Sequence, residues 1–584
     1  MVKSELLNSI SSIVVKNPKS ETGNPPAGWE SEGHIRNWEP ARRVGVRRTN
    51  PKSGLLTILL VSLALSHCAF SGNNSWDSQV RGSEDMPESI RHLVQKLATK
   101  SKKIENSTGL AITYPYDGAV FPPEIAAPVI VWDDTNPASN HWLIVVEFSS
   151  QRSPIYARAD KQQWAPDKPT WEAIKANSIH DPANITVYGF DHKHPGNITA
   201  KNSIRISTSK DRVDASIFYR QVQLPFQVGK KNFKKIKWRL GDISSYEKPP
   251  VVMENLPVCA SCHLFSKDGT LISMEMNYKA DSGAHFITPV RENIELSEEN
   301  FMSWNDFPKP ELLPKTRGLF AKMSPSGKYM VSTVHEISYA ALTNEAAFCQ
   351  LFFPTYGVLA WYSVDSRKFH LLPGADDYDF VQTDPSWSWD EKYIVFARST
   401  TKNEYHEDIT NIRTHIEDAD IHELNEKFPI QFDLYRIPFN QGKGGTPEPL
   451  KGASHNGMSN YFPRFSPDGK WIVFTRSRTG IMLQPDSELF IIPAAGGEAR
   501  RMRCNRELFN SWHSFSPNGK WMLFSSKANT PFTEIFLTHI DANGVDSTPV
   551  CLSRFSDDSY AANVPEFANL ESGAIRKISI SAHH

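Results

Sequence analysis

The chain of 584 residues carries almost no net charge, because 64 lysines and arginines nearly balance 65 aspartates and glutamates. Without a basic surplus, the composition has no electrostatic footprint for nucleic acid. The sequence also lacks a nucleophile elbow, a Walker loop and a zinc-protease helix motif, so none of these enzyme classes is indicated. Cysteine is scarce, with six residues. The candidate functional residues are therefore few, and the cysteines are among them.

No stretch near the N-terminus is apolar enough to span a membrane comfortably. The apolar run from Leu55 to Leu65 is short, follows the basic residues Arg47, Arg48 and Lys52, and precedes a small-residue segment that ends at Gly72. This order of basic, apolar and small residues is typical of an export signal. We therefore expect residues 51–72 to direct export in a bacterium, with a buried helix as the alternative.

Cys68 within this segment is a candidate lipidation site. Leu65 stands three residues before it, as in a bacterial lipoprotein signal, whereas His67 departs from the usual small residue. Cleavage after Ser71 would instead release a soluble periplasmic protein. We expect membrane contact through such a lipid anchor alone. Residues 1–50 are polar without an apolar period, and we interpret them as disordered or as a wrongly assigned start.

Two further cysteines lie in the sequence Cys259-Ala260-Ser261-Cys262-His263. Two cysteines separated by two residues and followed at once by histidine form the attachment signature of c-type haem. The thiols of Cys259 and Cys262 are expected to form thioethers to the porphyrin vinyl groups, and His263 is the expected proximal ligand of the iron. The motif at 259–263 therefore predicts one covalent haem c.

Two other interpretations of this cysteine pair exist. A zinc site would need further ligands, and no second pair at knuckle spacing is present. A thioredoxin-like redox pair would need a βαβ context, which the following residues do not provide. Of the remaining cysteines, Cys504 and Cys551 are the pair to test for a disulfide. The alternative is that these two and Cys349 are small buried apolar residues.

The rest of the chain is patterned as short strands. Residues 73–105 are polar and are expected to form a tether. Residues 106–234 contain about seven short apolar segments separated by proline, glycine, asparagine and aspartate, which predicts a β-sandwich of the immunoglobulin or fibronectin type III kind. From residue 235 the pattern changes to a repeat.

The repeat is clearest at Phe465–Phe474 and Phe515–Phe524, which share the sequence Phe-Ser-Pro-(Asp/Asn)-Gly-Lys-Trp. Each copy predicts a strand end, a tight turn and an apolar strand. The aligned serines of the five copies are Ser266, Ser324, Ser388, Ser466 and Ser516. A single unit cannot bury both faces of its small sheet, whereas a ring of such units can.

These repeats resemble those of TolB-type, WD40-like β-propellers, which are common in exported bacterial proteins. The resemblance implies an all-β fold with a propeller over residues 235–584. We expect six blades, with seven as the alternative. The sixth blade would combine outer strands at Lys237–Leu240 and Pro250–Met253 with inner strands at Val564–Phe567 and Ile575–Ile580.

The repeat alignment also places the haem motif on the fold. His263 precedes Phe265 by two residues, at the start of the innermost strand of the first blade, so the haem is expected across one mouth of the propeller. His513 precedes Phe515 by the same two residues and is the candidate distal ligand. The alternative for His513 is a hydrogen-bonded histidine that lines the channel. Met458 is the runner-up, followed by His335 and His455.

Three functions fit these expectations. The first is a monohaem cytochrome of the cell envelope that transfers electrons to a redox partner protein or senses redox state. The second is a binding or scaffold propeller with a structural haem, in which the sandwich domain recognises an envelope protein or a glycan. The third is a haem-dependent oxidoreductase with an open iron position. The sequence alone does not specify whether the chain is an enzyme.

Overall fold

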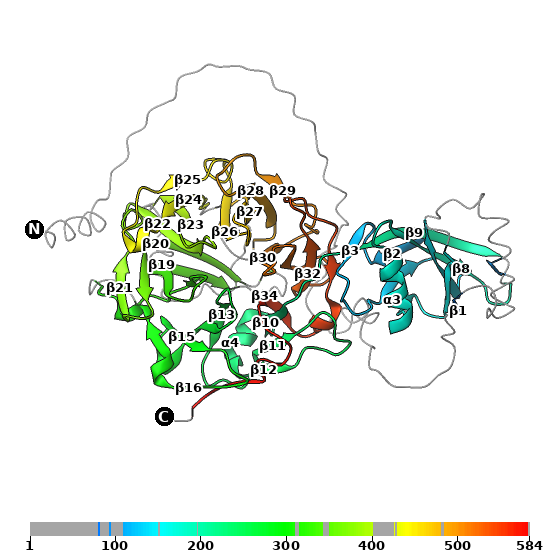
Figure 1. The fold of residues 1–584 in the computed structure, drawn as a ribbon, viewed down its shortest axis with the longest axis horizontal. Coiled ribbons are helices and arrows are strands. Elements are labelled where there is room, and N and C mark those ends of the chain that lie inside the picture. The colour runs from blue at the N-terminus through cyan, green and yellow to red at the C-terminus, as the bar shows by residue number, and fades with distance from the viewer. Residues whose placement is uncertain are drawn as a thin grey trace, which may run out of the picture. The chain divides into compact units, whose positions relative to one another are not determined.

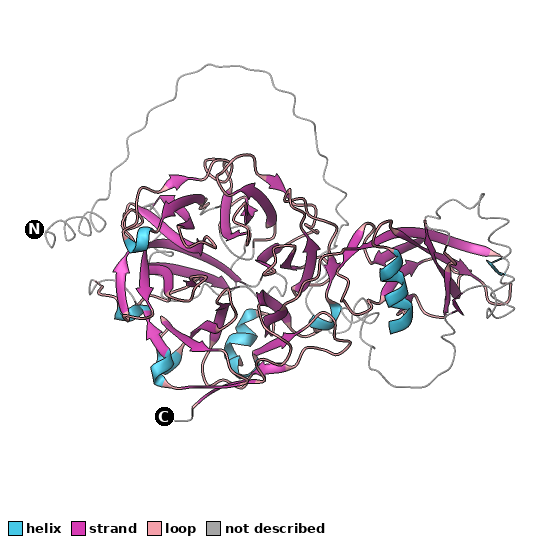
Figure 2. Cartoon of the chain, in the orientation of Figure 1, coloured by secondary structure: helices cyan, strands magenta, loops and turns pink. Residues whose placement is uncertain are grey.

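The computed structural model describes residues 80–81, 93–94, 109–149, 152–194, 197–309, 315–342, 348, 350–400, 425–426, 429–480 and 484–581. The export segment 51–72 with Cys68, residues 1–50 and Cys349 lie outside the described residues. Strands dominate the fold and helices are few (Figure 2), so the chain is all-β, as predicted. Among the described residues, no helix has the length and apolar character needed to cross a membrane.

The first part of the described chain forms two sheets. The larger has the strand order β1-β6-β5-β8-β9-β3 and the smaller has the order β2-β4-β7. The larger sheet contains β1 (Val80–Arg81), β3 (Ala119–Phe121), β5 (His141–Phe148), β6 (Ile155–Ala159), β8 (Ala183–Phe190) and β9 (Ile198–Thr208). The smaller contains β2 (Leu110–Tyr114), β4 (Ile130–Asp134) and β7 (Gln163–Trp164).

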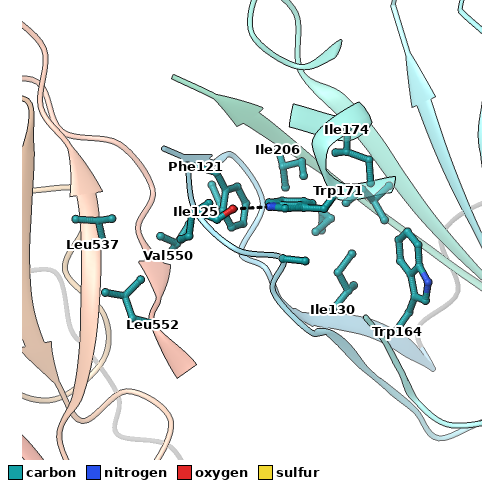
Figure 3. Packing of buried hydrophobic residues seen from close by; sticks show 14 of the residues in the cluster. Phe121, Ile125, Ile130, Trp164, Trp171, Ile174, Ile206, Leu537, Val550 and Leu552 are labelled. Carbon is teal, nitrogen blue, oxygen red and sulfur yellow. Dashed lines mark hydrogen bonds between the residues drawn. The ribbon is translucent and has the colours of Figure 1, made fainter. Parts of the chain in front are cut away.

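Between β7 and β8 the chain forms the helix α3 (Lys168–Asn177), which we did not predict. The side chain of Asp167 accepts a hydrogen bond from the Thr170 backbone N–H at 2.7 Å and so caps the first turn. Trp171 and Ile174 lie on one face of the helix and are fully buried. Figure 3 shows the indole N–H of Trp171, which donates to the Ile125 carbonyl oxygen at 2.9 Å within this core.

The remainder of the described chain contains six sheets of four strands each, arranged around a common centre (Figure 1). Their orders are β12-β11-β10-β34, β13-β14-β15-β17, β18-β19-β20-β21, β22-β23-β24-β25, β26-β27-β28-β29 and β30-β31-β32-β33. Neighbouring strands within each sheet are antiparallel. This arrangement is that of a β-propeller.

The strands of the first three of these sheets have the following bounds: β10 (Ser216–Val222), β11 (Lys237–Gly241), β12 (Val251–Met253), β34 (Ala561–Ala568), β13 (Ala260–Phe265), β14 (Leu271–Met276), β15 (Ala284–Pro289), β17 (Phe301–Ser303), β18 (Lys322–Met323), β19 (Tyr329–Leu342), β20 (Gln350–Ser363) and β21 (Lys368–Leu371). Those of the other three are β22 (Phe380–Trp387), β23 (Tyr393–Thr400), β24 (Asp433–Pro438), β25 (Glu448–Pro449), β26 (Ser459–Phe465), β27 (Trp471–Ser477), β28 (Glu488–Pro493), β29 (Arg500–Arg501), β30 (Asn510–Phe515), β31 (Trp521–Ser526), β32 (Glu534–His539) and β33 (Val550–Cys551). Short helices connect some of these strands, among them α4 (Phe226–Lys231).

The sheet β12-β11-β10-β34 joins the two ends of this region of the chain. The C-terminal strand β34 pairs with β10, so an edge that would otherwise be exposed is covered. Strand β10 lies within the stretch 106–234 that the sequence assigned to the sandwich, but all seven of its residues are buried and it belongs to this sheet.

Strand β35 (Lys577–Ile580) was expected to be an inner strand of the closing sheet, and this expectation is wrong. It pairs in parallel with β16 (Asn293–Leu296) instead. The inner position is already filled by β34, which places the last strand outside the closing sheet.

The repeated serine-to-glycine segments form the same turn in successive sheets, as predicted. In the copy at Ser466, its hydroxyl donates to Asp468 at 2.6 Å and accepts from the Trp471 N–H at 3.0 Å. The matching glycines adopt positive φ, from 69° at Gly519 to 74° at Gly269. Glycine suits this position because a side chain would be strained there.

Candidate functional site

The cysteine motif lies at the start of β13, the inner strand of its sheet. The pairing register with β14 shifts between Ala260 and His263, so Ser261 and Cys262 together oppose the single residue Glu275. Such a bulge bends the strand and re-aims the side chains around it. The backbone N–H of Asn277 donates to the Cys259 carbonyl oxygen at 2.8 Å and holds the first cysteine beside β14.

Both motif cysteines line one cavity of about 710 Å³. Cys259 and Cys262 are half-buried and are free thiols. Burial raises the pKa of the Cys262 thiol to about 12, and the charge of Glu275 adds to this rise. Cys262 is therefore a neutral thiol at neutral pH. The sequence-predicted attachment residues are brought together on the wall of a cavity of ligand size.

A ring of equivalent positions surrounds this cavity, and we refer to it as the mouth ring. Its six members each stand three residues before the last aromatic or methionine residue of an inner strand, and all six line the cavity. They are Cys262, Phe320, Asp384, Phe462, Trp512 and Val564. Except for Cys262, all have positive φ between 51° and 61°. In five of the six sheets, a bulge of the inner strand turns this side chain toward the cavity.

Two residues further along each inner strand lies a second ring. Its members line a smaller cavity of about 100 Å³ and are Leu264, Lys322, Ser386, Arg464, Ser514 and Glu566. Three of them, Lys322, Arg464 and Glu566, also line the larger cavity. Arg464 and Glu566 form an ion pair at 3.4 Å.

His263 does not line the cavity into which its neighbouring cysteines open. The imidazole is 1 % exposed, and its Nε2–H donates to the Phe218 carbonyl oxygen at 3.3 Å. Because a carbonyl accepts only, Nδ1 carries the lone pair, and this atom is buried without a partner. Burial lowers the pKa of His263 to about 3, so the ring is neutral.

His513 occupies the matching place on β30. Its Nε2–H donates to the Val473 carbonyl oxygen at 2.9 Å, and its Nδ1 is also buried without a partner. Burial lowers the pKa of His513 to about 3. Unlike His263, this residue does line the cavity of the cysteines. His513 thus makes the hydrogen bond expected of a histidine that only lines the channel. Its Nδ1 atom also keeps a free lone pair.

The other candidate iron ligands lie elsewhere. Met458 lines a separate cavity of about 770 Å³, together with Tyr116 and Arg478. His335 bonds to the Tyr378 hydroxyl and to the Pro308 carbonyl oxygen. His455 is exposed and pairs with Asp433 at 3.1 Å. The structure brings none of these three to the motif cysteines.

Several charged residues of the cavity were missed by the sequence reasoning. Glu275 on β14 and Asp384 on β22 are buried carboxyls, and burial raises the pKa of each to about 7. Arg220 on β10 and Lys322 on β18 are buried cations. The repeats align Asp384 with Cys262, so the sequence does carry a signal that could have identified Asp384. Arg220 lies outside the repeats, so the sequence carries no such signal for it.

The lining of this cavity fits a covalently attached porphyrin in three respects. The two motif cysteines line it, aromatic residues of the mouth ring provide apolar surface, and buried cations match carboxylate substituents. The buried lone pair on His263 Nδ1 belongs to a neutral imidazole, the form that binds metals. The present orientation of this ring, toward Phe218, is the one feature that a bound iron would have to change.

Within the described ranges, no group of three or more histidine, cysteine, aspartate or glutamate side chains is arranged to hold a metal ion. A haem iron takes one or two ligands from the protein, so its site is judged from single residues such as His263 and His513.

No protein-family model matches the chain, and no curated protein matches it. Among solved structures, it is similar to TolB from Acinetobacter baumannii, with 13 % identity and a TM-score of 0.36, over 68 % of this chain and 85 % of that one. It is also similar to a TolB protein from Agrobacterium tumefaciens, with 14 % identity, a TM-score of 0.31 and coverage of 58 % and 88 %. An oligogalacturonate lyase from Vibrio parahaemolyticus has 9 % identity, a TM-score of 0.23 and coverage of 56 % and 99 %.

Proposed function

We propose that this chain is a monohaem c-type cytochrome of the bacterial cell envelope, acting in electron transfer or redox sensing. The observation that carries the proposal is that Cys259 and Cys262, the two cysteines of the attachment motif, open into the same cavity. A porphyrin held by both thiols needs such a shared space. Two cysteines of a structural zinc site would instead need further ligands beside them.

In this proposal the thiols of Cys259 and Cys262 hold the haem, and His263 is the proximal ligand. Bound haem supplies a one-electron redox couple. The mouth-ring residues Phe320, Phe462 and Trp512 line the cavity and would shield a bound haem from water. The His263 imidazole is neutral, as an iron ligand must be. Because this ring does not line the cavity, iron ligation would require it to turn toward the cavity.

His513 is the proposed distal ligand. It lines the cavity, it is neutral, and its Nδ1 lone pair has no hydrogen-bond donor. Met458 is a weaker candidate because it lines a different cavity. Export supports the same proposal, because c-type haem is attached outside the cytoplasm in bacteria and residues 51–72 have the pattern of an export signal.

The test is haem staining of the denatured protein after export from a host that carries the c-type maturation machinery. The wild-type chain and the variant Cys504→Ala should retain stain, since Cys504 is buried away from the motif. The variant Cys259→Ala/Cys262→Ala should lose it. Stain that is absent from the wild type, or that survives loss of both motif cysteines, would refute the proposal.

The spectrum of the same preparation separates the possible roles. Low-spin iron with a reversible one-electron couple supports electron transfer or redox sensing. High-spin iron that reacts with peroxide would instead favour an oxidoreductase with an open iron position.

A further inference from the structure

Two cations are buried in the cavity of the cysteines without an opposite charge bonded to them. Arg220 and Lys322 are each 8 % exposed, and both line the cavity. In the part of the chain that the structure describes, neither side chain forms an ion pair or a hydrogen bond, and Nε of Arg220 is fully buried without a partner. The Arg220 guanidinium lies 5.7 Å from the centre of the Trp238 ring, and the charges of Asp384 and Glu566 act on Lys322. Neither cation has an anion bonded to it, and such burial is costly, so an anionic ligand would be stabilised there.

The two cations come from different sheets. Arg220 lies on β10, whose partner β34 contacts the motif strand β13 from one side, and Lys322 lies on β18, which contacts β13 from the other side. Both charges act on the Cys262 thiol, where they oppose part of the rise in pKa that burial causes. Two separate positive charges therefore flank the attachment site.

The acidic residues of the cavity are engaged with other donors. Glu275 accepts hydrogen bonds from the Ser261 hydroxyl and from the Phe320 N–H, the latter at 3.0 Å. Asp384 accepts from the Phe462 N–H, and Glu566 pairs with Arg464 at 3.4 Å. The charge of Lys322 acts on all three carboxyls, but none of them bonds to it or to Arg220. The hydrogen-bond donors of both cations are therefore available to a ligand.

We propose that Arg220 and Lys322 form a binding site for an organic dicarboxylate, with one carboxylate at each cation. The guanidinium of Arg220 offers planar donors to a carboxylate, and the Lys322 ammonium offers a point charge. Apolar mouth-ring residues beside them, Phe320, Phe462 and Trp512, pack against the carbon skeleton between the two acids. The dicarboxylate is either the pair of propionates of a porphyrin or a free dicarboxylic acid.

The test uses the full chain produced without haem maturation, so that binding does not depend on thioether formation. Quenching of tryptophan fluorescence measures the affinity for metal-free protoporphyrin IX and for its dimethyl ester, and calorimetry measures the affinity for succinate. We expect the porphyrin diacid to bind at least about tenfold more tightly than its ester, because a hydrogen bond to a charged group has about this effect.

The variants Arg220→Leu and Lys322→Met should each weaken binding of the diacid by about tenfold, and together they should abolish the preference over the ester. Arg220→Lys and Lys322→Arg keep the charge and should therefore retain part of the preference for the diacid over the ester. The matched control is Arg398→Leu, since Arg398 on β23 has a side chain that is only 10 % exposed and does not line the cavity. Thermal unfolding checks that each variant is folded.

The outcomes separate this site from the proposed function. Dependence of porphyrin binding on both cations supports the site and identifies the propionates as its ligand. The same dependence for succinate, with no porphyrin binding, supports the site, identifies a free dicarboxylic acid and counts against the haem. Equal affinity for diacid and ester, with no effect of folded variants and no succinate binding, overturns the inference even if covalent haem is found.

Discussion

His263 and His513 make the same hydrogen bond from equivalent places on two inner strands. Each imidazole donates Nε2–H to a carbonyl oxygen on the second strand of the neighbouring sheet, Phe218 at 3.3 Å and Val473 at 2.9 Å. Burial lowers the pKa of both to about 3. Each ring is therefore neutral and keeps an unshared lone pair on Nδ1.

This relationship predicts the effect of removing either histidine from the haem-loaded protein. If His263 and His513 are the two axial ligands, His263→Ala and His513→Ala should each convert a low-spin absorption spectrum to a high-spin one. His335→Ala is the control, because His335 bonds to Tyr378 and Pro308 instead. A His513→Ala protein with an unchanged spectrum would show that another group takes the sixth position.

Asp384 should make the haem-free chain less stable as the pH rises. Burial raises its pKa to about 7, whereas the unfolded chain has a value of about 3.9. The folded state therefore favours the protonated carboxyl. The resulting contribution to the free energy of unfolding is full below pH 4 and is lost as the pH rises through 7, at about 1.4 kcal/mol per pH unit.

Asp384→Asn keeps an oxygen to accept from the Phe462 N–H but cannot ionise. We expect it to match the wild type at pH 4 and to be more stable at pH 8, by on the order of 2 to 4 kcal/mol. Melting temperatures at the two pH values measure this. Asp133→Asn, at an exposed position on β4, is the control. A constant difference between wild type and Asp384→Asn across this range would contradict the predicted titration.

Gly374 tests the contact between two neighbouring four-stranded sheets. It has a φ of 92°, and a Cβ atom there would lie 1.8 Å from the Gly445 carbonyl oxygen. Gly573 has a similar φ of 80° but open space around its Cβ position. Gly374→Ala should therefore cost at least about 2 kcal/mol more than Gly573→Ala, whose cost is backbone strain alone. Urea unfolding midpoints compare them, and equal midpoints would refute this packing.

The four-stranded sheets and their turns could be predicted from the sequence because their signals are local. A serine, an aspartate or asparagine and a glycine within four residues specify the turn, and an apolar strand follows directly. The copies at Ser466 and Ser516 show this in the structure. Closure by strands from both ends of the chain followed from the need to cover sheet edges.

The features that could not be predicted from the sequence depend on pairing between strands far apart in the chain or on β-bulges. Strand β10 carries no repeat motif, and its partner β34 lies more than 300 residues later, so Arg220 could not be placed in the cavity. The direction of His263 depends on the bulge between Ala260 and His263, which the two-residue alternation of strands does not reveal. Most of the mouth ring has the same origin, since the positive φ values of Asp384, Phe462, Trp512 and Val564 arise at such bulges.

The suggested disulfide between Cys504 and Cys551 is not formed. Both are free, buried thiols, and the Cys551 thiol contacts Glu534 at 3.8 Å. Burial raises the pKa of each thiol well above its ordinary value. We expect both to resist alkylation in the native protein and to react after unfolding without a reductant, as seen by peptide mass analysis. A disulfide-linked peptide would contradict this.

The proposed covalent haem at residues 259–263 can be tested directly. The most direct measurement is the mass of the peptide containing Cys259 and Cys262, from protein exported in a host with the c-type maturation machinery. We predict one haem attached to this peptide through both cysteines. An unmodified peptide with two free thiols, obtained while a known c-type cytochrome in the same cells is fully loaded, would contradict the account.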